Sequence, residues 1–408
     1  MAKKRKSIFK KAISWLHLWL GLISGLVIVI ISITGCLFVF QKEFSELKYK
    51  NVFFIPARKT VTLPLHQLQE IAQHALGKNQ PVNYITVWKD PKRAWEFMAY
   101  KENDTALTYF GAMEYYRSAF LNPHTGQITG IRNYKTDFFQ IVKYLHWSLL
   151  LNDRYGQPIV GWSTVIFVVM LITGLVLWWP KKWNRVARKR SFSIHWKGRF
   201  RRVNYDLHNV LGFYFYIPAL ILALTGMVYA FQWFQSIVYA AASGTTAYAE
   251  QPVVKSLSSG FAVNDPMTIA WHEAVKNNPA YLRMNITPAT GSDGVISIYS
   301  YTDEEIYYNY QEMHFDQYSG NLIRQQAWAQ KNPGERLIGM NYDIHVGAIG
   351  GLTGKIIAFF ASLVSASLPI TGFYIWWNKK KKRAHIPYTP PDSMRQAVTE
   401  RSISESTQ

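Results

Sequence analysis

The stretch Ser14–Phe40, SWLHLWLGLISGLVIVIISITGCLFVF, contains no Asp, Glu, Lys or Arg. A helix that spans a bilayer needs about 20 mostly apolar residues, so this stretch is long enough to cross. Comparable apolar stretches occur near residues 158–179, 209–231 and 355–377. The four stretches predict an α-helical membrane protein with a four-transmembrane-helix bundle.

The charges predict how these helices lie in the membrane. The chain of 408 residues has a net charge of +20, and about half of its 45 Lys and Arg residues flank the spans in three short segments. Because Lys and Arg are enriched in cytoplasmic loops, we expect both termini inside, and the charge does not indicate a nucleic-acid partner. The expected order is a basic cytoplasmic tail (1–13), a first span (14–41), a periplasmic segment (42–155), a second span (156–179), a cytoplasmic loop (180–206), a third span (207–232), a second periplasmic segment (233–353), a fourth span (354–377) and a cytoplasmic tail (378–408).

The single cysteine, Cys36, follows Ile33-Thr34-Gly35, a pattern that is also typical of a lipoprotein cleavage site. The apolar region before it is longer than the roughly 7–15 residues of a signal peptide, which favours an uncleaved span and leaves the lipoprotein as the alternative. One cysteine excludes an internal disulfide and covalent haem attachment through two cysteines.

The two halves of the chain share a histidine, Gly and Thr-Gly pattern. In the first helix of each half, the matching residues are His17, Leu20-Gly21 and Thr34-Gly35 against His208, Leu211-Gly212 and Thr225-Gly226. In the second, they are His146, Thr173-Gly174 and Trp178-Trp179 against His345, Thr371-Gly372 and Trp376-Trp377. The pattern indicates a tandem duplication whose repeats are related by an axis along the membrane normal.

Each external segment has the pattern of a small α+β module. Helical periodicity is found at 65–77 and 266–277, and each helix is followed by strand-like runs. These runs lie at 82–88, 94–100 and 116–121 in the first segment and at 281–287, 294–300, 307–315 and 321–328 in the second. Turn residues follow in both segments, at Asn122–Gly126 and Asp316–Gly320. Each segment is long enough to fold on its own, so we expect two modules.

Four of the eleven histidines lie at membrane boundaries in equivalent pairs. His17 and His208 begin the first and third spans on the inner side, while His146 and His345 precede the second and fourth spans on the outer side. An ionisable residue in a bilayer indicates a functional site with a partner. Two facing imidazoles suit the two axial positions of a haem iron, whereas structural zinc usually takes four ligands. We therefore expect two noncovalent b-type haems.

Small residues lie where flat macrocycles would need space between helices. At 100° per residue, Gly35 shares the face of His17, and Gly226 shares the face of His208. Gly35 lies about 27 Å along the axis from His17 at roughly 1.5 Å per residue, which is the outer layer. We expect Gly35 and Gly226 to flank the outer haem and Gly174 and Gly372 to flank the inner one, although small residues also serve close helix packing.

These residues resemble the PepSY-associated transmembrane family of bacterial inner membranes, which includes ferrisiderophore reductases. The resemblance rests on Trp15-Leu16-His17 with Gly21, Leu145-His146-Trp147, Asp206-Leu207-His208 with Gly212, the four Thr-Gly pairs, Trp178-Trp179-Pro180 and the two turns. It implies two periplasmic PepSY-like modules and a haem protein that passes electrons to a ferric siderophore or other iron chelate in the periplasm.

The expected function is therefore that of an oxidoreductase, with haem iron axially held by His17, His208, His146 and His345. A separate quinol or flavin reductase would donate electrons, His195 is a further candidate near that donor, and no catalytic side chain is assigned. Two alternatives stay open. One is a nonenzymatic membrane protein that binds or regulates a periplasmic partner, and the other is a transporter for haem, metal or siderophore.

Overall fold

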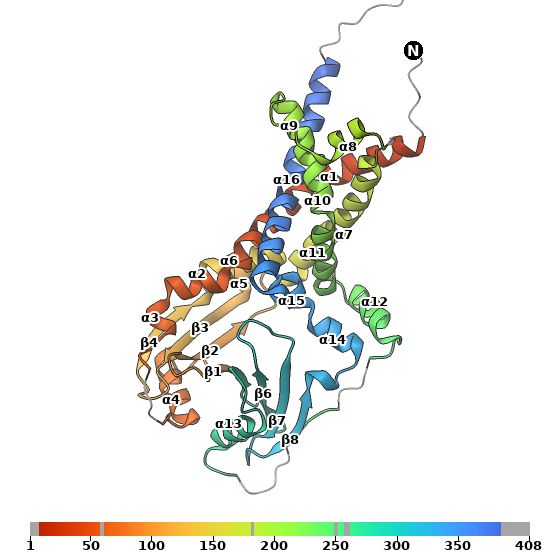
Figure 1. Cartoon of the computed structure of the whole chain (residues 1–408). Helices are drawn as coiled ribbons and strands as arrows, with labels where there is room; N and C mark the ends of the chain where they lie inside the picture. Colours follow the sequence, from red (N-terminus) through yellow and green to blue (C-terminus); the bar gives the residue numbers. More distant parts are fainter. Residues whose placement is uncertain (1–7, 58–60, 181–182, 249–251, 257–261, 385–408) are drawn as a thin grey trace, which may run out of the picture.

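The computed structural model describes residues 8–57, 61–180, 183–248, 252–256 and 262–384. The basic residues expected at 1–7, Lys181, Lys182 and the tail from 385 lie outside the described residues. The described chain has two parts, a bundle of long helices and a sheet domain below it in Figure 1. The sheet domain is formed by the two segments that were expected to lie outside the membrane.

Three continuous helices are long and apolar enough to cross a membrane, as expected. They are α1 (Ile8–Val39), α7 (Asp153–Trp178) and α16 (Gly351–Ala384). In the bundle, α1 packs against α7 and α16, and the shorter α11 (Tyr216–Ala230) also packs against both. Close approaches occur at small residues, because a Cβ on Gly25 would lie 3.2 Å from Pro369 Cβ.

The third expected span is bent rather than continuous. It is formed by α9 (Phe200–Asp206), the π-helical turn η2 (Leu207–Leu211) and α10 (Gly212–Tyr214), followed by α11 after a bend of 66°. Phe215 leaves helical geometry with φ −96° and ψ 9°. Pro218 follows in the first turn of α11, and its missing N–H removes a hydrogen bond across the bend. The apolar content of a sequence does not by itself predict such a bend.

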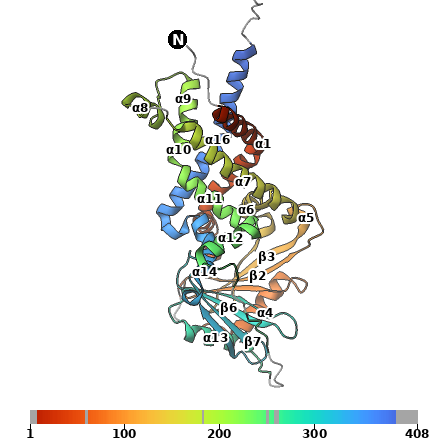
Figure 2. The same ribbon diagram turned by 90° about the vertical axis from the view of Figure 1, so that its right-hand side faces the viewer.

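The sheet has eight antiparallel strands in the order β4-β3-β2-β1-β5-β6-β7-β8 (Figure 2). Their bounds are β1 (Tyr84–Trp88), β2 (Trp95–Glu102), β3 (Met113–Leu121), β4 (Ile128–Asn133), β5 (Arg283–Thr287), β6 (Val295–Tyr301), β7 (Tyr310–Asp316) and β8 (Leu322–Ala327). Seven of these strands coincide with the expected runs. The strand β4 was not expected, because Gly130 interrupts its short apolar pattern.

The two external segments do not form separate sheets, which corrects the expectation of two independent modules. Strand β1 of the first segment pairs with β5 of the second, in the register Ile85 with Ile286 and Val87 with Met284. An open strand edge is a template for another strand, and here each segment covers the edge of the other. The two segments therefore form one sheet with one apolar core.

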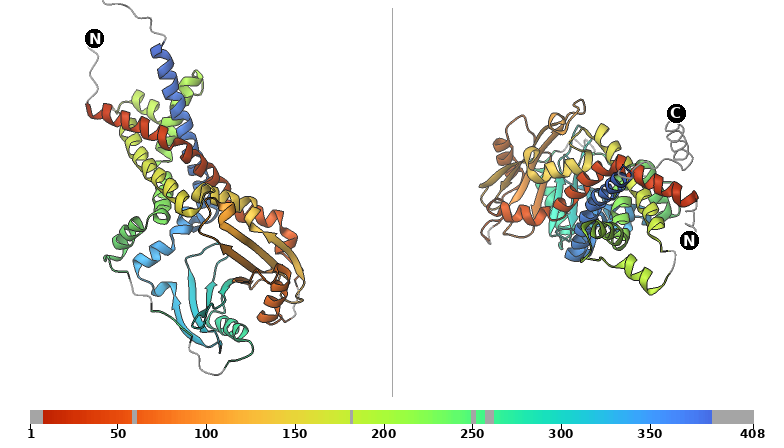
Figure 3. Two further views of the ribbon diagram at one scale, coloured as in Figure 1. Left: turned by 180° about the vertical axis from the view of Figure 1, so that it is seen from behind. Right: turned by 90° about the horizontal axis from the view of Figure 1, so that it is seen from above.

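The two faces of the sheet have different roles. One face packs against α4 (Leu65–Leu76) and α13 (Pro266–Asn277), and its core includes the fully buried Ile85, Val87 and Phe97. Side chains alternate between faces along a strand, so Tyr84, Thr86 and Trp88 lie on the opposite side. That second face looks toward the helix bundle, as Figures 1 and 3 show from front and back.

Short helices connect the sheet to the bundle. They are α2 (Gln41–Lys48), α3 (Lys50–Phe53), α5 (Tyr109–Ala112), η1 (Tyr134–Thr136), α6 (Phe138–Ser148), α12 (Gln232–Ser243), η3 (Trp328–Gln330), α14 (Pro333–Gly339), α15 (Asn341–His345) and η4 (Ala348–Gly350). Helix α8 (Arg185–Phe192) lies at the other end of the bundle, next to α9 (Figure 1). Helix α6 carries His146, and α15 ends at His345. After α6, Leu149 and Leu150 both have positive φ, 57° and 58°, so the chain turns sharply into α7.

Candidate functional site

The inner histidine pair lies between α1 and the π-helical turn η2. The rings of His17 and His208 have their centres 6.5 Å apart and are nearly perpendicular, at 88°. His208 is positioned by the extra residue of the π-turn, a feature that is frequent at functional sites. The structure thus brings together two residues that the sequence related by its internal repeat.

The outer pair lies where α6 and α15 meet the external ends of α1 and α11. The rings of His146 and His345 have their centres 6.0 Å apart at 64°. Burial lowers the pKa of His146, and burial together with the charge of His146 lowers the pKa of His345 to about 3. Both imidazoles are therefore neutral at physiological pH, which is the state of a metal ligand.

Each of the four imidazoles hydrogen-bonds through Nδ1, which leaves Nε2 available. His17 and His208 contact the Oγ1 atoms of Thr173 and Thr371, each at 2.9 Å. In the outer pair, His345 Nδ1 lies 2.8 Å from Thr225 Oγ1. His146 Nδ1 lies 2.7 Å from the carbonyl oxygen of Ile31 and 3.3 Å from Thr34 Oγ1.

The threonine hydroxyls determine which ring nitrogen carries the proton. Thr173 donates its hydroxyl proton to the Val169 carbonyl at 2.8 Å, and Thr371 donates to Ser367 at 2.8 Å. A hydroxyl has one proton, so its oxygen can only accept from the histidine. Nδ1 is then the protonated nitrogen, and the lone pair of Nε2 is free to bind a metal.

The comparison of the two halves of the sequence identified these threonines only as neighbours of the glycines that provide space between helices. Their hydrogen bonds to the histidines were missed, although the invariable order Thr-Gly in all four spans was the available signal. Glycine alone would provide space. A threonine one residue earlier also provides the acceptor that orients the neighbouring ring.

The four glycines lie beside the histidines in the expected grouping. A Cβ built on Gly174 would lie 3.2 Å from His17 Cε1, and one on Gly372 would lie 3.2 Å from His208 Cε1. The corresponding distances are 3.4 Å from Gly35 to His146 Cε1 and 3.6 Å from Gly226 to His345 Cε1. Any larger side chain at the two inner positions would press on the imidazole. Each glycine therefore allows a ring to lie directly against a helix backbone.

Two other glycines of the expected ligand faces have a packing role instead. Gly21 lies against Met170, with a Cβ position 2.7 Å from Met170 Cε, and Gly212 lies against Leu368, at 3.4 Å from Cδ2. His195 is exposed, and its backbone N–H donates to the Asp206 carboxylate at 3.2 Å. Neither these two glycines nor His195 belongs to the surroundings expected for a haem at a histidine pair.

The spacing of the pairs fits one metal ion between each two rings. Imidazole nitrogen binds first-row metals at about 2.0 Å, which places the centres of two opposed rings roughly 6 Å apart. Among the described residues there is no group of three or more His, Cys, Asp or Glu that could hold a metal ion. Two axial nitrogens fit an iron whose other four ligands come from a porphyrin.

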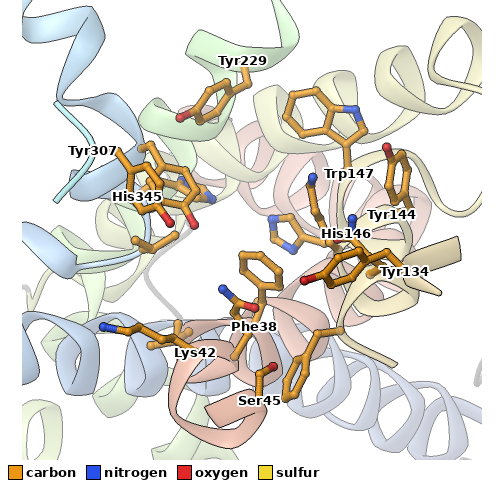
Figure 4. Close-up of a pocket in the computed structure, with 18 of the residues that line it drawn as sticks. Phe38, Lys42, Ser45, Tyr134, Tyr144, His146, Trp147, Tyr229, Tyr307 and His345 are labelled. Carbon is orange, nitrogen blue, oxygen red and sulfur yellow. The ribbon is translucent and has the colours of Figure 1, made fainter. Parts of the chain in front are cut away.

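A cavity of about 1160 Å³ adjoins the outer pair (Figure 4). Its bundle side includes His146, His345, Gly35 and Gly226, and its opposite side is the second face of the sheet. Sheet residues at this wall include Tyr84, Glu96, Tyr100, Tyr116 and Asn285. Figure 4 shows Tyr134, Tyr144 and Tyr307 among the residues that line the same space. The outer pair therefore faces a partly open cavity that is large enough for a further ligand.

A family model described as the PepSY-associated TM region matches residues 14–379, which is nearly the whole chain. The chain belongs to the PepSY-associated transmembrane family. All four histidines and all four Thr-Gly pairs of this PepSY-associated protein lie within the matched region. A search of curated proteins finds no match to the sequence.

Proposed function

We propose that this PepSY-associated protein is a transmembrane electron conduit that reduces a ferric siderophore or another ferric chelate outside the membrane. His17 and His208 would hold an inner b-type haem, and His146 and His345 an outer one. Bound haem supplies a one-electron iron couple that protein side chains lack. Each reduced chelate takes one electron, which converts Fe(III) to Fe(II).

The observation that carries this proposal is the repeated arrangement of two neutral imidazoles with free Nε2 atoms. A pair of buried histidines that only packed in the core would not need Nδ1 to be held by an acceptor of a neighbouring helix in all four cases, by a threonine for three of them and mainly by the Ile31 carbonyl for His146. The two pairs also lie at opposite ends of α1, because His17 is near its start and Thr34-Gly35 near its end. That is an arrangement suited to crossing a membrane in two steps.

The protein side chains would do three things in this function. The histidines bind the iron, the threonines orient the histidines, and the helix backbones at the glycines exclude water from the imidazoles. The cavity next to His146 and His345 would receive the chelate. A separate quinol or flavin reductase would supply electrons near His17 and His208.

The orientation is part of the same proposal. We place the protein in the bacterial inner membrane with both termini in the cytoplasm and the sheet domain in the periplasm, because the described basic segment from Arg185 to Arg202 lies at the end of the bundle away from the sheet. The same order of one helix and four strands in each half supports a tandem duplication and the assignment of both halves as PepSY-like modules.

The test is the haem content of the purified protein from haem-replete cells. We expect two haems per polypeptide, a Soret band, and reduction by dithionite. His17→Ala with His208→Ala should remove one haem, and His146→Ala with His345→Ala should remove the other. Absence of haem from the wild-type protein would refute the proposal, and loss of both haems from either double variant would refute the assignment of separate sites.

A further inference from the structure

The cavity wall carries five cationic side chains, and three of them are neutralised by carboxylates. Lys42 pairs with Glu304 at 3.2 Å, Arg93 pairs with Glu46 at 2.7 Å, and Arg132 pairs with Asp137 at 2.7 Å. The other two cations are Arg283 on β5 and Lys143 on α6.

Arg283 and Lys143 differ from these three in having no carboxylate partner. Across the described ranges of the chain, neither cation takes part in an ion pair. The side chain of Lys143 is exposed to the cavity, one helical turn before His146. The two cations therefore have no carboxylate at ion-pair distance, and Asp343 near Arg283, and Glu102 and Asp153 near Lys143, act on them only from farther away.

Arg283 is the more informative of the two, because it is only 5% exposed. Its Nε and Nη2 atoms are buried without a hydrogen-bond acceptor. Aromatic rings surround the guanidinium, with the ring centres of Tyr301 and Tyr307 each 4.4 Å away and that of Trp88 5.8 Å away. The rings stabilise the cation, but they accept none of its directional hydrogen bonds. A buried charged donor without an acceptor is costly in a folded protein.

The two unpartnered nitrogens are the ones that form a fork on one edge of the guanidinium. Nε–H and Nη2–H point in nearly parallel directions, so they match the two oxygens of a carboxylate. This geometry is more selective than a positive charge alone, since a lysine has no such fork. Both nitrogens are covered in this structure, so a carboxylate reaches them when a neighbouring side chain of the wall, such as that of Tyr307, moves aside.

The surroundings of Arg283 connect it to the outer histidine pair. Tyr307, which lies against Arg283, donates its backbone N–H to the Asp343 carboxylate at 3.1 Å, and its ring lies 5.3 Å from that of Tyr342. Both partners belong to α15, the short helix that ends at His345. Figure 4 shows Tyr307 beside His345 at the cavity wall.

We propose that Arg283, assisted by Lys143, is a binding seat for a carboxylate in the cavity beside the outer histidine pair. The carboxylate has two chemically equivalent sources, a free carboxylate of the ferric chelate and a propionate of the outer haem. The role of the seat in reduction rests on the proposed function, whereas its affinity for a carboxylate does not.

The experiment uses the full-length protein in lipid nanodiscs and a chelate that cannot be reduced. Binding of Ga(III)-citrate is measured for the wild type, Arg283→Gln, Arg283→Lys and Lys143→Gln. A Ga(III) trihydroxamate without a free carboxylate is the control ligand. Arg154→Gln is the control variant, because Arg154 is an exposed arginine that does not line the cavity.

If the seat holds a chelate carboxylate, Arg283→Gln weakens Ga(III)-citrate binding by roughly 10- to 100-fold, the range of a charge-assisted hydrogen bond. Arg283→Lys recovers only part of this loss, because it restores the charge but not the fork. Lys143→Gln, at an exposed position that folding does not require, has a smaller effect in the same direction. Binding of the Ga(III) trihydroxamate is the same in all variants. Arg154→Gln binds Ga(III)-citrate as tightly as the wild type.

If the seat holds a propionate, the variants bind Ga(III)-citrate normally, and the midpoint potential of one of the two haems shifts or that haem is lost. Unchanged chelate binding, haem content and potentials in folded Arg283→Gln and Lys143→Gln would overturn the proposal. Loss of Ga(III)-citrate binding in a protein without haem would support the seat and refute the electron-transfer function, so the two failures are distinguishable.

Discussion

Lys355 of α16 forms a 2.7 Å ion pair with Glu43 of α2, and a second 2.7 Å ion pair joins it to Glu305 in the loop between β6 and β7. Its side chain is only 7% exposed, whereas Glu43 and Glu305 are 43% and 36% exposed. One lysine thus connects a candidate transmembrane helix to residues that precede and belong to the two halves of the sheet domain.

Replacing this lysine should loosen the junction between bundle and sheet. Lys355→Met removes the cation from two partly exposed carboxylates, and we expect a loss of about 1–3 kcal/mol in the free energy of unfolding. The measurement is denaturant unfolding of the detergent-solubilised protein. Lys101→Met is the control, because Lys101 and Glu114 form an exposed pair, and it should have a much smaller effect on stability. Equal losses in both variants would show that burial of Lys355 does not matter.

The orienting role of the threonines predicts a cofactor effect without a change of shape. Thr371→Val removes the hydroxyl that accepts from His208 Nδ1 and keeps the side-chain volume. Loss of a hydrogen-bond partner of a metal-binding histidine typically lowers metal affinity by roughly 10- to 100-fold. The proposed inner haem should therefore transfer faster to a haem-binding protein that has been stripped of its own haem. Thr371→Ser retains the hydroxyl and should behave as the wild type. Identical transfer rates in the valine and serine variants would contradict the assigned tautomer.

The notch at Gly174 predicts a steric effect on the same site. Gly174→Ala places a methyl group 3.2 Å from His17 Cε1, so the ring must shift, and Gly174→Val should displace it further. We expect an altered low-spin spectrum for the alanine variant and about one haem per chain for the valine variant. Gly350→Ala is a matched control, because a Cβ there meets nothing within 4 Å. Two haems with unchanged spectra in Gly174→Val would rule out close packing of imidazole against this backbone.

Glu96, in the wall of the cavity, predicts a pH dependence of stability. Burial raises the pKa of the Glu96 carboxyl above its ordinary value, although the hydroxyl of Tyr134, which donates to Oε1 at 2.9 Å, and the charge of Arg132 partly offset this effect. In the pH range between the unfolded and folded pKa values, the folded protein binds more protons than the unfolded chain. The contribution of Glu96 to the free energy of unfolding therefore falls as pH rises through that range.

Glu96→Gln should remove this dependence. The variant keeps an acceptor for Tyr134 and has no proton to lose, so its unfolding temperature should fall less than that of the wild type between pH 5 and pH 8. Thermal unfolding of both proteins at several pH values provides the comparison, which cancels the titration of all other groups. Parallel curves for the two proteins would place the Glu96 carboxyl in an ordinary, solvated environment.

Local patterns predicted most elements, and the misses have physical causes. The helix at 266–277 agrees with α13, the span at 158–179 ends one residue after α7, and the span at 355–377 lies within α16, because periodicity and apolar length are properties of neighbouring residues. The bend at Phe215 depends on one proline and on the π-turn before it. The pairing of β1 with β5 depends on a contact between distant segments, which no local pattern contains.

For the site, the pattern shared by the two halves of the sequence predicted which histidines and glycines come together, because matching residues in two similar halves are expected at equivalent places. The hydrogen bonds of Thr173 and Thr371 require the rotation of each helix about its axis, which small-residue notches alone do not fix. The sequence also could not predict the cavity or the position of Arg283 in its wall. Both arise from the way the sheet face closes against the bundle.

The ladder between β1 and β5 runs from Ile85 to Trp88 and from Arg283 to Ile286. Carriers that work by alternating access rock one repeat against the other, and such rocking here would have to tear this seam open. The pairing of β1 with β5 joins the two halves of the chain in one continuous sheet. In the proposed function, the reactants would therefore reach the cavity through movements of side chains and loops.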